Sequence, residues 1–180
     1  HYRLDRLTLD IRELIRALGR ERAILVAHDW GGAVAWRFAM DYASSVEKLI
    51  VMNAPHPVAF ARELRDNWNQ RRKSWYMFFF QLPWLPETLL GFSPQHSARL
   101  FFRRTALRAG AFSEADLRVM ASAIAQPGAL EGMINWYRAA FRFPPRQRTR
   151  VIEAPTHLIW AEDDMALDKS LTYGLDKYAP

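Results

Sequence analysis

The sequence contains no cysteine. This absence excludes a disulfide framework and any zinc site built on thiolates. No apolar run approaches the roughly 18 to 20 residues that span a bilayer, and no basic-then-apolar signal peptide opens the chain. Half of the 180 residues are apolar and 13% are aromatic, which is not the composition of a disordered tail. We therefore expect a soluble, cytoplasmic protein with one core, or a core and a small appendage.

Acidic residues are fewer than basic ones, 19 against 25, so the net charge is 25 − 19 = +6. Such an excess can indicate a nucleic-acid or membrane partner. Here the cations are mostly arginine, scattered over the whole sequence, and no RNA-binding signature accompanies them. We therefore expect no nucleic-acid partner and no membrane partner.

Hydrophobic patterning predicts alternating helices and strands. Apolar residues recur at helical spacing from residue 7 to residue 18, and Gly19 follows as a stop signal. Three short apolar runs are typical of strands buried in a parallel sheet: residues 23–27, 48–52 and 156–160. A helix is expected over residues 31–42, between the first two strands. This order predicts an α/β fold with a parallel sheet and right-handed crossovers.

The stretch between the second and third strands shows helical periodicity and no convincing strand. Ser113 and Asp116 form a capping box before one helix, and Pro127 with Gly128 separates it from the next. The sequence therefore predicts a partial core over residues 1–57, a helical insertion over 58–144 and a return to the core over 145–180.

Asp29 stands in the sequence His-Asp-Trp-Gly-Gly, directly after the first strand. Small residues around a central residue allow a sharp strand-to-helix turn that exposes the central side chain, and this residue is usually serine. An aspartate is anionic at neutral pH, since its reference pKa is about 3.9, and it can attack an sp³ carbon to form an alkyl ester. The alternative is that Asp29 is merely the N-cap of the next helix.

Five segments, in order, make the sequence resemble the epoxide hydrolases of the α/β-hydrolase fold. They are HDWGG at 28–32, NAPHP at 53–57, SWYMFFFQLPWLPE at 74–87, NWYRA at 135–139 and WAEDD at 160–164. The resemblance implies an α/β-hydrolase fold with a partial parallel sheet of about three strands. It also implies that the insertion over 58–144 is a helical cap.

The resemblance assigns roles to individual residues. Asp29 is the expected nucleophile, and Trp30 supplies a backbone oxyanion donor. Tyr76 and Tyr137 are the expected donors to the epoxide oxygen. Asp164 is the expected charge-relay acid, with its neighbour Asp163 as the alternative. Substrate contacts are expected from aromatic residues: Trp30, Trp75, Phe79 and Trp136.

The tyrosine roles make chemical sense, because an opening epoxide develops charge on its oxygen. Two phenol O–H groups can hydrogen-bond that oxygen and yield a proton to it. The alternative for Tyr76 and Tyr137 is ordinary aromatic packing. No metal and no organic cofactor is implied, and water is the second substrate beside a small apolar epoxide.

Two family features are missing from the sequence. No His-Gly-x-Pro segment occurs, and none of the five histidines matches the base that related enzymes carry beyond the acid. The histidines are His1, His28, His56, His96 and His157. The sequence therefore looks like an internal fragment. Alkylation of Asp29 needs no histidine, whereas hydrolysis of the ester does, so at best one turnover is expected.

Two other functions remain open. Haloalkane dehalogenases also use an aspartate elbow, but halide release favours indole N–H donors, whereas the two tyrosines favour an epoxide. The other possibility is a non-catalytic relic or binding module that retains the cap. Oligomeric state cannot be read from the sequence.

Overall fold

The computed structural model describes residues 2–144 and 150–179. Its contacts divide the chain into two compact units. One comprises the residues up to Ser74 together with those from Phe143 onward, and the other runs from Trp75 to Arg142. We describe each unit by itself.

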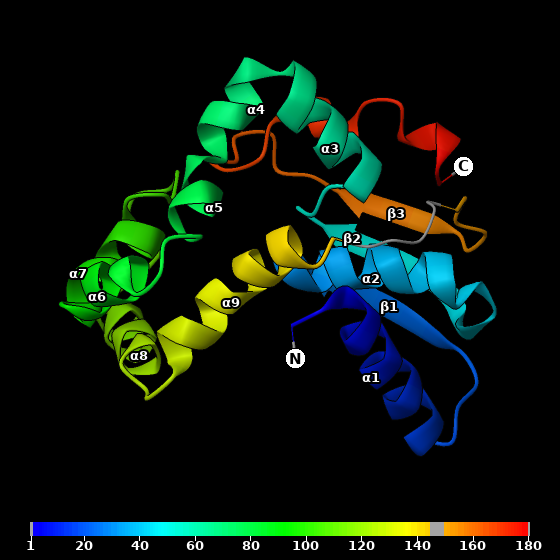
Figure 1. Cartoon of the computed structure of the whole chain (residues 1–180), viewed down its shortest axis with the longest axis horizontal. Coiled ribbons are helices and arrows are strands. Elements are labelled where there is room, and N and C mark those ends of the chain that lie inside the picture. The colour runs from blue at the N-terminus through cyan, green and yellow to red at the C-terminus, as the bar shows by residue number, and fades with distance from the viewer. Residues whose placement is uncertain (1, 145–149, 180) are drawn as a thin grey trace. The chain divides into compact units, whose positions relative to one another are not determined.

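The first unit is built on a three-stranded parallel sheet in the order β1-β2-β3 (Figure 1). The strands are β1 (Ala23–His28), β2 (Val46–Met52) and β3 (Thr156–Ile159). Helix α1 (Leu4–Ala17) precedes β1, and α2 (Asp29–Asp41) with the short η1 (Ala43–Ser45) joins β1 to β2. The predicted parallel sheet is therefore confirmed, with strand boundaries shifted by at most two residues.

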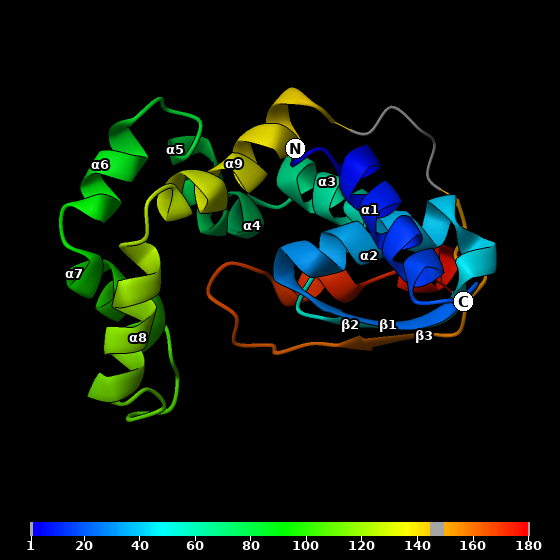
Figure 2. The same cartoon turned by 90° about the horizontal axis from the view of Figure 1, so that it is seen from below.

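The core of this unit lies between the sheet and the helices α1 and α2, which cover the same side of it (Figure 2). Alternate strand residues such as Leu49 and Val51 meet Trp36 and Phe38 of α2, and all four side chains are fully buried. The burial follows from the two-residue period of a strand, which sends every second side chain to one face. Trp36 also donates from Nε1 to the Ala54 carbonyl at 2.9 Å, so its one polar atom is satisfied.

The opposite face of β1 carries apolar side chains that remain exposed: Ile24 is 51% and Val26 61% accessible. In the sheet that the structure describes, β1 is also an edge strand. An edge with free backbone groups and apolar side chains is a template for pairing with another chain.

We expect the 180-residue chain to self-associate through β1. Val26→Lys should reduce this association, because a charge on an edge strand opposes pairing. Leu14→Lys is the matched control, since Leu14 is 55% exposed but lies on α1. Sedimentation velocity over a concentration series measures the effect. A monomeric wild-type chain at all concentrations would contradict the expectation.

Residues 57–73 form α3 (Pro57–Asp66) and α4 (Trp68–Lys73), which belong to the sheet unit. The predicted insertion began at residue 58, so the helical unit in the structure starts 17 residues later. The reason is a set of hydrogen bonds from these helices to the C-terminal segment. Glu63 accepts from Ser170 Oγ at 2.6 Å, and Asn67 donates to the same hydroxyl at 3.0 Å.

The C-terminal segment of the first unit contains two 3₁₀ turns, η3 (Lys169–Thr172) and η4 (Leu175–Lys177). Arg62 of α3 donates to the carbonyls of Ser170 and Tyr173, both at 3.1 Å. The predicted return to the core was placed at residue 145, and residues 145–149 lie outside the described residues.

In the second unit, from Trp75 to Arg142, the described residues form helices joined by turns and loops, with no strand among them. Its elements are α5 (Trp75–Phe79), α6 (Leu85–Gly91), α7 (Pro94–Ala98), the π-helical η2 (Arg99–Arg103), α8 (Glu114–Ile124) and α9 (Ala129–Arg142). The expected capping box begins α8: Ser113 accepts from the Asp116 N–H, and the Asp116 carboxylate accepts from the Ser113 N–H. Ala98, Ala121 and Ile124 form its buried apolar cluster.

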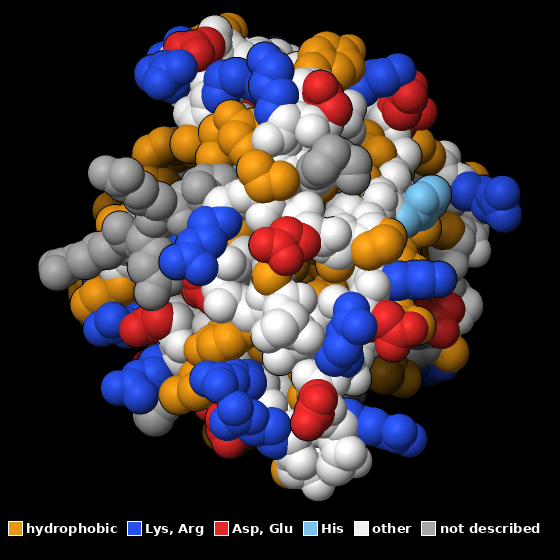
Figure 3. Space-filling view, turned by 90° about the vertical axis from the view of Figure 1, so that its right-hand side faces the viewer, with side chains coloured by type: hydrophobic (Ala, Val, Ile, Leu, Met, Phe, Trp, Pro, Cys, Tyr) orange, Lys and Arg blue, Asp and Glu red, His pale blue; other side chains and the backbone are white. Residues whose placement is uncertain are grey.

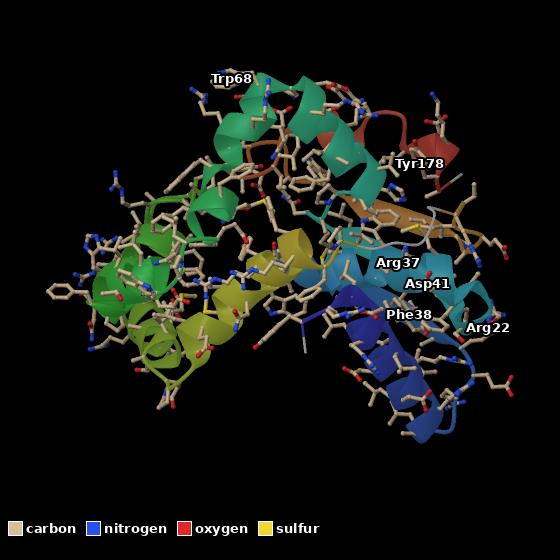
Figure 4. The ribbon with its side chains drawn as sticks, viewed as in Figure 1. Arg22, Arg37, Phe38, Asp41, Trp68 and Tyr178 are labelled. Carbon is tan, nitrogen blue, oxygen red and sulfur yellow. The ribbon has the colours of Figure 1, made fainter. Side chains whose placement is uncertain are left out.

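Charges of both signs are interspersed over the face seen in Figure 3, with no large basic patch. Within the first unit, the buried Arg37 is neutralised four residues along α2 by Asp41, with N···O distances of 2.7 and 2.6 Å (Figure 4). Among the described helices, none has the length and apolar character needed to cross a lipid bilayer.

Candidate active site

The candidate site of the first unit lies where its three parallel strands end. His28 pairs with Met52, and Met52 pairs with Ile159, so the strands end in register. Asp29, Asn53 and the loop that starts at Trp160 therefore leave the sheet at the same edge. In open α/β sheets, this carboxyl edge is where ligands bind.

Asp29 has a left-handed backbone conformation, with φ of +51°. Such a conformation costs a non-glycine residue on the order of 1 kcal/mol or more and is concentrated at functional sites. The range of α2 begins at Asp29, with His28 before it, and no side-chain cap hydrogen bond is made at this end of the helix. The alternative that Asp29 merely caps the helix therefore gains no support. The turn instead presents an exposed carboxylate at the strand-to-helix junction.

Gly32 allows α2 to pass close to the chain that leaves β2. A Cβ atom placed on Gly32 would lie 2.2 Å from the Ala54 Cβ and 3.2 Å from Val51 Cγ1. By contrast, a Cβ on Gly31 would meet nothing within 4 Å. The second glycine of the motif is therefore required by helix-to-strand packing, and the first is not required by space.

We expect Gly32→Ala to destabilise the first unit by about 2 kcal/mol, because overpacking forces the backbone to shift. Gly31→Ala is the matched control and should change the free energy of unfolding by less than about 1 kcal/mol. Urea denaturation followed by tryptophan fluorescence measures both. Equal effects of the two substitutions would show that the Ala54 contact does not determine the turn.

Asp164 lies in the loop after β3, and its carboxylate is held on both oxygens. Oδ1 accepts from the backbone N–H of Ala166 at 2.7 Å and of Leu167 at 2.9 Å. Oδ2 accepts from Asn53 Nδ2 at 2.7 Å. Asp164 is half-buried, whereas Asp163 is exposed. This environment favours Asp164 over its neighbour as the acid of the site.

Tyr76 and Tyr137 come together in the second unit from α5 and α9. Their ring centroids lie 5.6 Å apart, with the planes at 81°. Phe80 packs against both rings, at 5.8 Å from Tyr76 and 4.9 Å from Tyr137. Two residues that are 61 positions apart in sequence thus form one aromatic pair.

Arg138 fixes the helix of Tyr137 to the segment that follows α5. It donates to the carbonyls of Phe80 and Leu82 and forms an ion pair with Glu87. Burial by itself would raise the pKa of Glu87. The hydrogen bonding and charge of Arg138, together with a backbone hydrogen bond, outweigh burial, so the pKa is lowered. The pair therefore stays ionised at neutral pH and holds the two helical segments together.

The other predicted site residues are placed as follows. Trp30 lies in the first turn of α2, where backbone N–H groups lack acceptors within the helix. Trp75 is 64% exposed on α5, with its ring 6.0 Å from that of Phe79. Trp136 is half-buried on α9, next to Tyr137 in sequence.

None of the described histidines hydrogen-bonds to the carboxylate of Asp164. Within the described residues, the carboxylate of Asp164 accepts only from Asn53, Ala166 and Leu167, and no histidine is among them. His28, His96 and His157 are exposed on their elements, and His1 lies outside the described residues.

His56 is completely buried at the start of α3. Its ring stacks on Tyr178 at 4.8 Å and meets the edge of Trp36 at 5.2 Å. Its Nδ1 accepts from the Val58 N–H at 3.3 Å, whereas Nε2 has no partner among the described residues. Burial lowers the pKa of His56 to about 4, so the ring is neutral at physiological pH. These contacts indicate a packing role in the core.

Sequence reasoning missed Asn53, which hydrogen-bonds the Asp164 carboxylate directly. The available signal was an asparagine immediately after a predicted strand, because asparagine tolerates left-handed backbone conformations. Among the described residues, no group of three or more histidine, aspartate or glutamate side chains is arranged to hold a metal ion.

Comparison with known proteins gives consistent matches. The alpha/beta hydrolase fold family matches residues 1–180. Epoxide hydrolase 1 of Caenorhabditis elegans is 41% identical over 172 residues, 93% of this chain and 43% of that protein. Human epoxide hydrolase 4 is 36% identical, over 93% of this chain and 47% of its own length. The chain thus spans less than half of either relative.

A similar fold has been solved in an epoxide hydrolase from Bacillus megaterium in complex with an inhibitor. Its TM-score to this chain is 0.87 at 30% sequence identity, covering 99% of this chain and 66% of that one. A structure of epoxide hydrolases from metagenomes of hot environments gives a TM-score of 0.80 at 31% identity.

Proposed function

Because this chain belongs to the alpha/beta hydrolase fold family, we propose that it carries the nucleophile, the acid and the cap of an epoxide hydrolase. The observation that carries the proposal is the left-handed backbone of Asp29 at the carboxyl edge of a parallel sheet. Backbone strain is concentrated at functional sites, and an exposed aspartate makes no packing contribution that would explain the strain here.

In the first step, a carboxylate oxygen of Asp29 attacks one ring carbon of the epoxide. The C–O bond of the ring breaks, and its electron pair stays on the former epoxide oxygen. Tyr76 and Tyr137 donate hydrogen bonds to that oxygen, and one phenol transfers its proton to it. The product is a hydroxyalkyl ester of Asp29.

In the second step, water attacks the carbonyl carbon of that ester. The negative charge that develops on the carbonyl oxygen is stabilised by N–H groups of the elbow, including that of Trp30. The acyl C–O bond then breaks, and the departing alkoxide takes a proton from the protonated base and leaves as the diol. The proton of the resulting Asp29 carboxylic acid returns to the tyrosinate left by the first step, which restores the Asp29 carboxylate. The proton that water loses requires a base, and Asp164 is the acid that orients and stabilises such a base.

The helical unit from Trp75 to Arg142 is the cap in this proposal, and its aromatic side chains select the substrate. Trp75, Phe79 and Trp136, together with Trp30 of the core, favour an apolar epoxide. The packing of the two tyrosines against Phe80 supports the donor pair, because it holds both phenols on neighbouring helices.

Product analysis tests the proposal. The protein is incubated with styrene oxide and, separately, with 1-chlorohexane, and both the products and the intact protein mass are measured. An adduct on Asp29 or formation of the diol supports the epoxide reaction. Chloride release from the haloalkane would instead favour a dehalogenase, and no reaction with either compound would favour a non-catalytic binding module.

A further inference from the structure

Asn53 is the first residue after β2 and stands beside Asp29 at the carboxyl edge of the sheet. Its backbone is left-handed, with φ of +37°. The backbone N–H donates to the Ile159 carbonyl at 3.0 Å, which ties the end of β2 to the end of β3. The side chain is therefore anchored at a position fixed by two strands.

The side-chain amide of Asn53 accepts one hydrogen bond and donates another. Oδ1 accepts from the Ala161 N–H at 2.7 Å, and Nδ2 donates to Asp164 Oδ2 at 2.7 Å. A backbone N–H can only donate, so the Ala161 contact fixes which end of the amide carries the oxygen. Asn53 must therefore direct its NH₂ group at the carboxylate.

The carboxylate of Asp164 is consequently held from two sides. An ionised carboxylate offers about four acceptor positions. The N–H groups of Ala166 and Leu167 occupy Oδ1, and Asn53 occupies one position on Oδ2. Among the described residues, one position on Oδ2 remains for a further donor, and the carboxylate cannot rotate without breaking these bonds.

Two residues of helix α4 hydrogen-bond to the backbone of the loop that carries Asp164. The fully buried Gln70 donates to the Ala166 carbonyl at 2.9 Å and accepts from the Asp168 N–H at 2.7 Å. Lys73 donates from Nζ to the carbonyls of Asp164 and Leu167, at 2.6 and 3.2 Å. The loop backbone from residue 164 to residue 168 is thereby secured independently of Asn53. Asn53 itself holds the start of the loop through the Ala161 N–H and the Asp164 carboxylate through its NH₂ group.

We propose that Asn53 is a positioning residue, whose amide orients Asp164 so that its remaining Oδ2 position faces the base of the second step. This inference rests on the proposed function and deepens it. Asn53 touches neither the nucleophile nor the epoxide in this scheme. Its loss should therefore slow hydrolysis of the ester and leave alkylation of Asp29 unchanged.

The test uses the whole protein that the gene encodes, and styrene oxide is the probe. In a two-step reaction with irreversible alkylation, kcat/KM reports alkylation, and a slow hydrolysis step sets kcat. Asn53→Ala should lower kcat, or lengthen the lifetime of the ester adduct, about ten- to a hundredfold, because a hydrogen bond to a charged group is lost. The value of kcat/KM should stay within about twofold.

Three further variants separate orientation from folding. Asn53→Gly relieves the left-handed backbone but lacks the amide, and we expect it to lose as much kcat as Asn53→Ala. Asn53→Asp keeps the side-chain shape and the acceptor for Ala161 but offers no donor, so it should lose at least as much. Asn69→Ala is the matched control, because Asn69 is exposed on α4 and bonds Asp168; it should behave as wild type.

The outcomes distinguish this inference from the proposed function. Wild-type kinetics in Asn53→Gly or Asn53→Asp would overturn the role of the amide while leaving the epoxide hydrolase proposal intact. An equal fall of kcat and kcat/KM would also overturn it, since alkylation would then depend on Asn53. If the wild-type protein forms neither ester nor diol, the proposed function fails, and this inference fails with it.

Discussion

Replacing Asp29 by alanine is expected to abolish both the ester adduct and diol formation, with a loss of at least about a thousandfold in rate. The proposed reaction has no bond-forming step without this carboxylate, because water reacts only with the ester that Asp29 makes. Peptide mass spectrometry after incubation with styrene oxide measures the adduct, and the modified peptide should contain residue 29.

The control for this experiment is Asp10→Ala. Asp10 lies on the exposed side of α1, so its removal should leave the adduct unchanged. The left-handed backbone of residue 29 disfavours alanine as it disfavours aspartate, so the Asp29→Ala protein should retain its fold at similar stability. An adduct on another residue of the Asp29→Ala protein would show that Asp29 is not the nucleophile.

Acidification is expected to destabilise the first unit before its carboxylates titrate, and His56 is the reason. Its pKa is about 4 in the folded protein because of burial, against about 6.5 in the unfolded chain. Between these values the unfolded chain binds more protons, so the free energy of unfolding falls as the pH falls. We expect losses of about 2 kcal/mol by pH 5 and about 3 kcal/mol by pH 4, relative to pH 7.5.

The carboxylates with lowered pKa values contribute at lower pH. For Glu63, burial by itself would raise the pKa, but hydrogen bonds from Ser170, Asn67 and Arg62 lower it overall. Its contribution to stability is present above the unfolded value of about 4.3 and is lost as the pH falls through the lower folded pKa. The window from pH 6.5 to 5 therefore isolates the histidine.

Urea denaturation at pH 7.5, 6.0 and 5.0 measures the effect. His56→Phe retains an aromatic ring beside Tyr178 but cannot be protonated, so its unfolding free energy should change little across this window. His157→Gln, at an exposed position of β3, should keep the wild-type pH dependence. A wild-type stability that is flat between pH 7.5 and 5 would contradict the assignment.

Local sequence signals were sufficient to predict the strands, the start of α8 and the elbow at Asp29. Continuous apolar runs predicted the three parallel strands, which the structure contains. The expectation that these strands are buried on both faces was wrong for β1 and β3, where every second residue is exposed. The capping box at Ser113 marked the start of α8, because the hydrogen bonds of a cap are made within one turn. The aspartate elbow was likewise readable, because its turn is encoded by neighbouring small residues.

The extent of the helical unit was not readable from local signals. Residues 58–74 are helical in pattern and helical in structure, yet they belong to the sheet unit. Their membership depends on hydrogen bonds between α3 or α4 and residues about 100 positions later, such as Gln70 with Ala166. Helical periodicity shows which face of a helix is apolar, but it does not show which other segment packs against that face.

By itself, the sequence determined the fold class, the strands and the choice of Asp29 as the candidate nucleophile. Only the tertiary structure decided that Asn53 holds Asp164, that Gly32 rather than Gly31 is required by packing, and that His56 is a buried neutral ring. The physical reason is the range of the interactions. A turn or a cap is made by residues a few positions apart, whereas these contacts join segments that meet only when parallel strands align their ends.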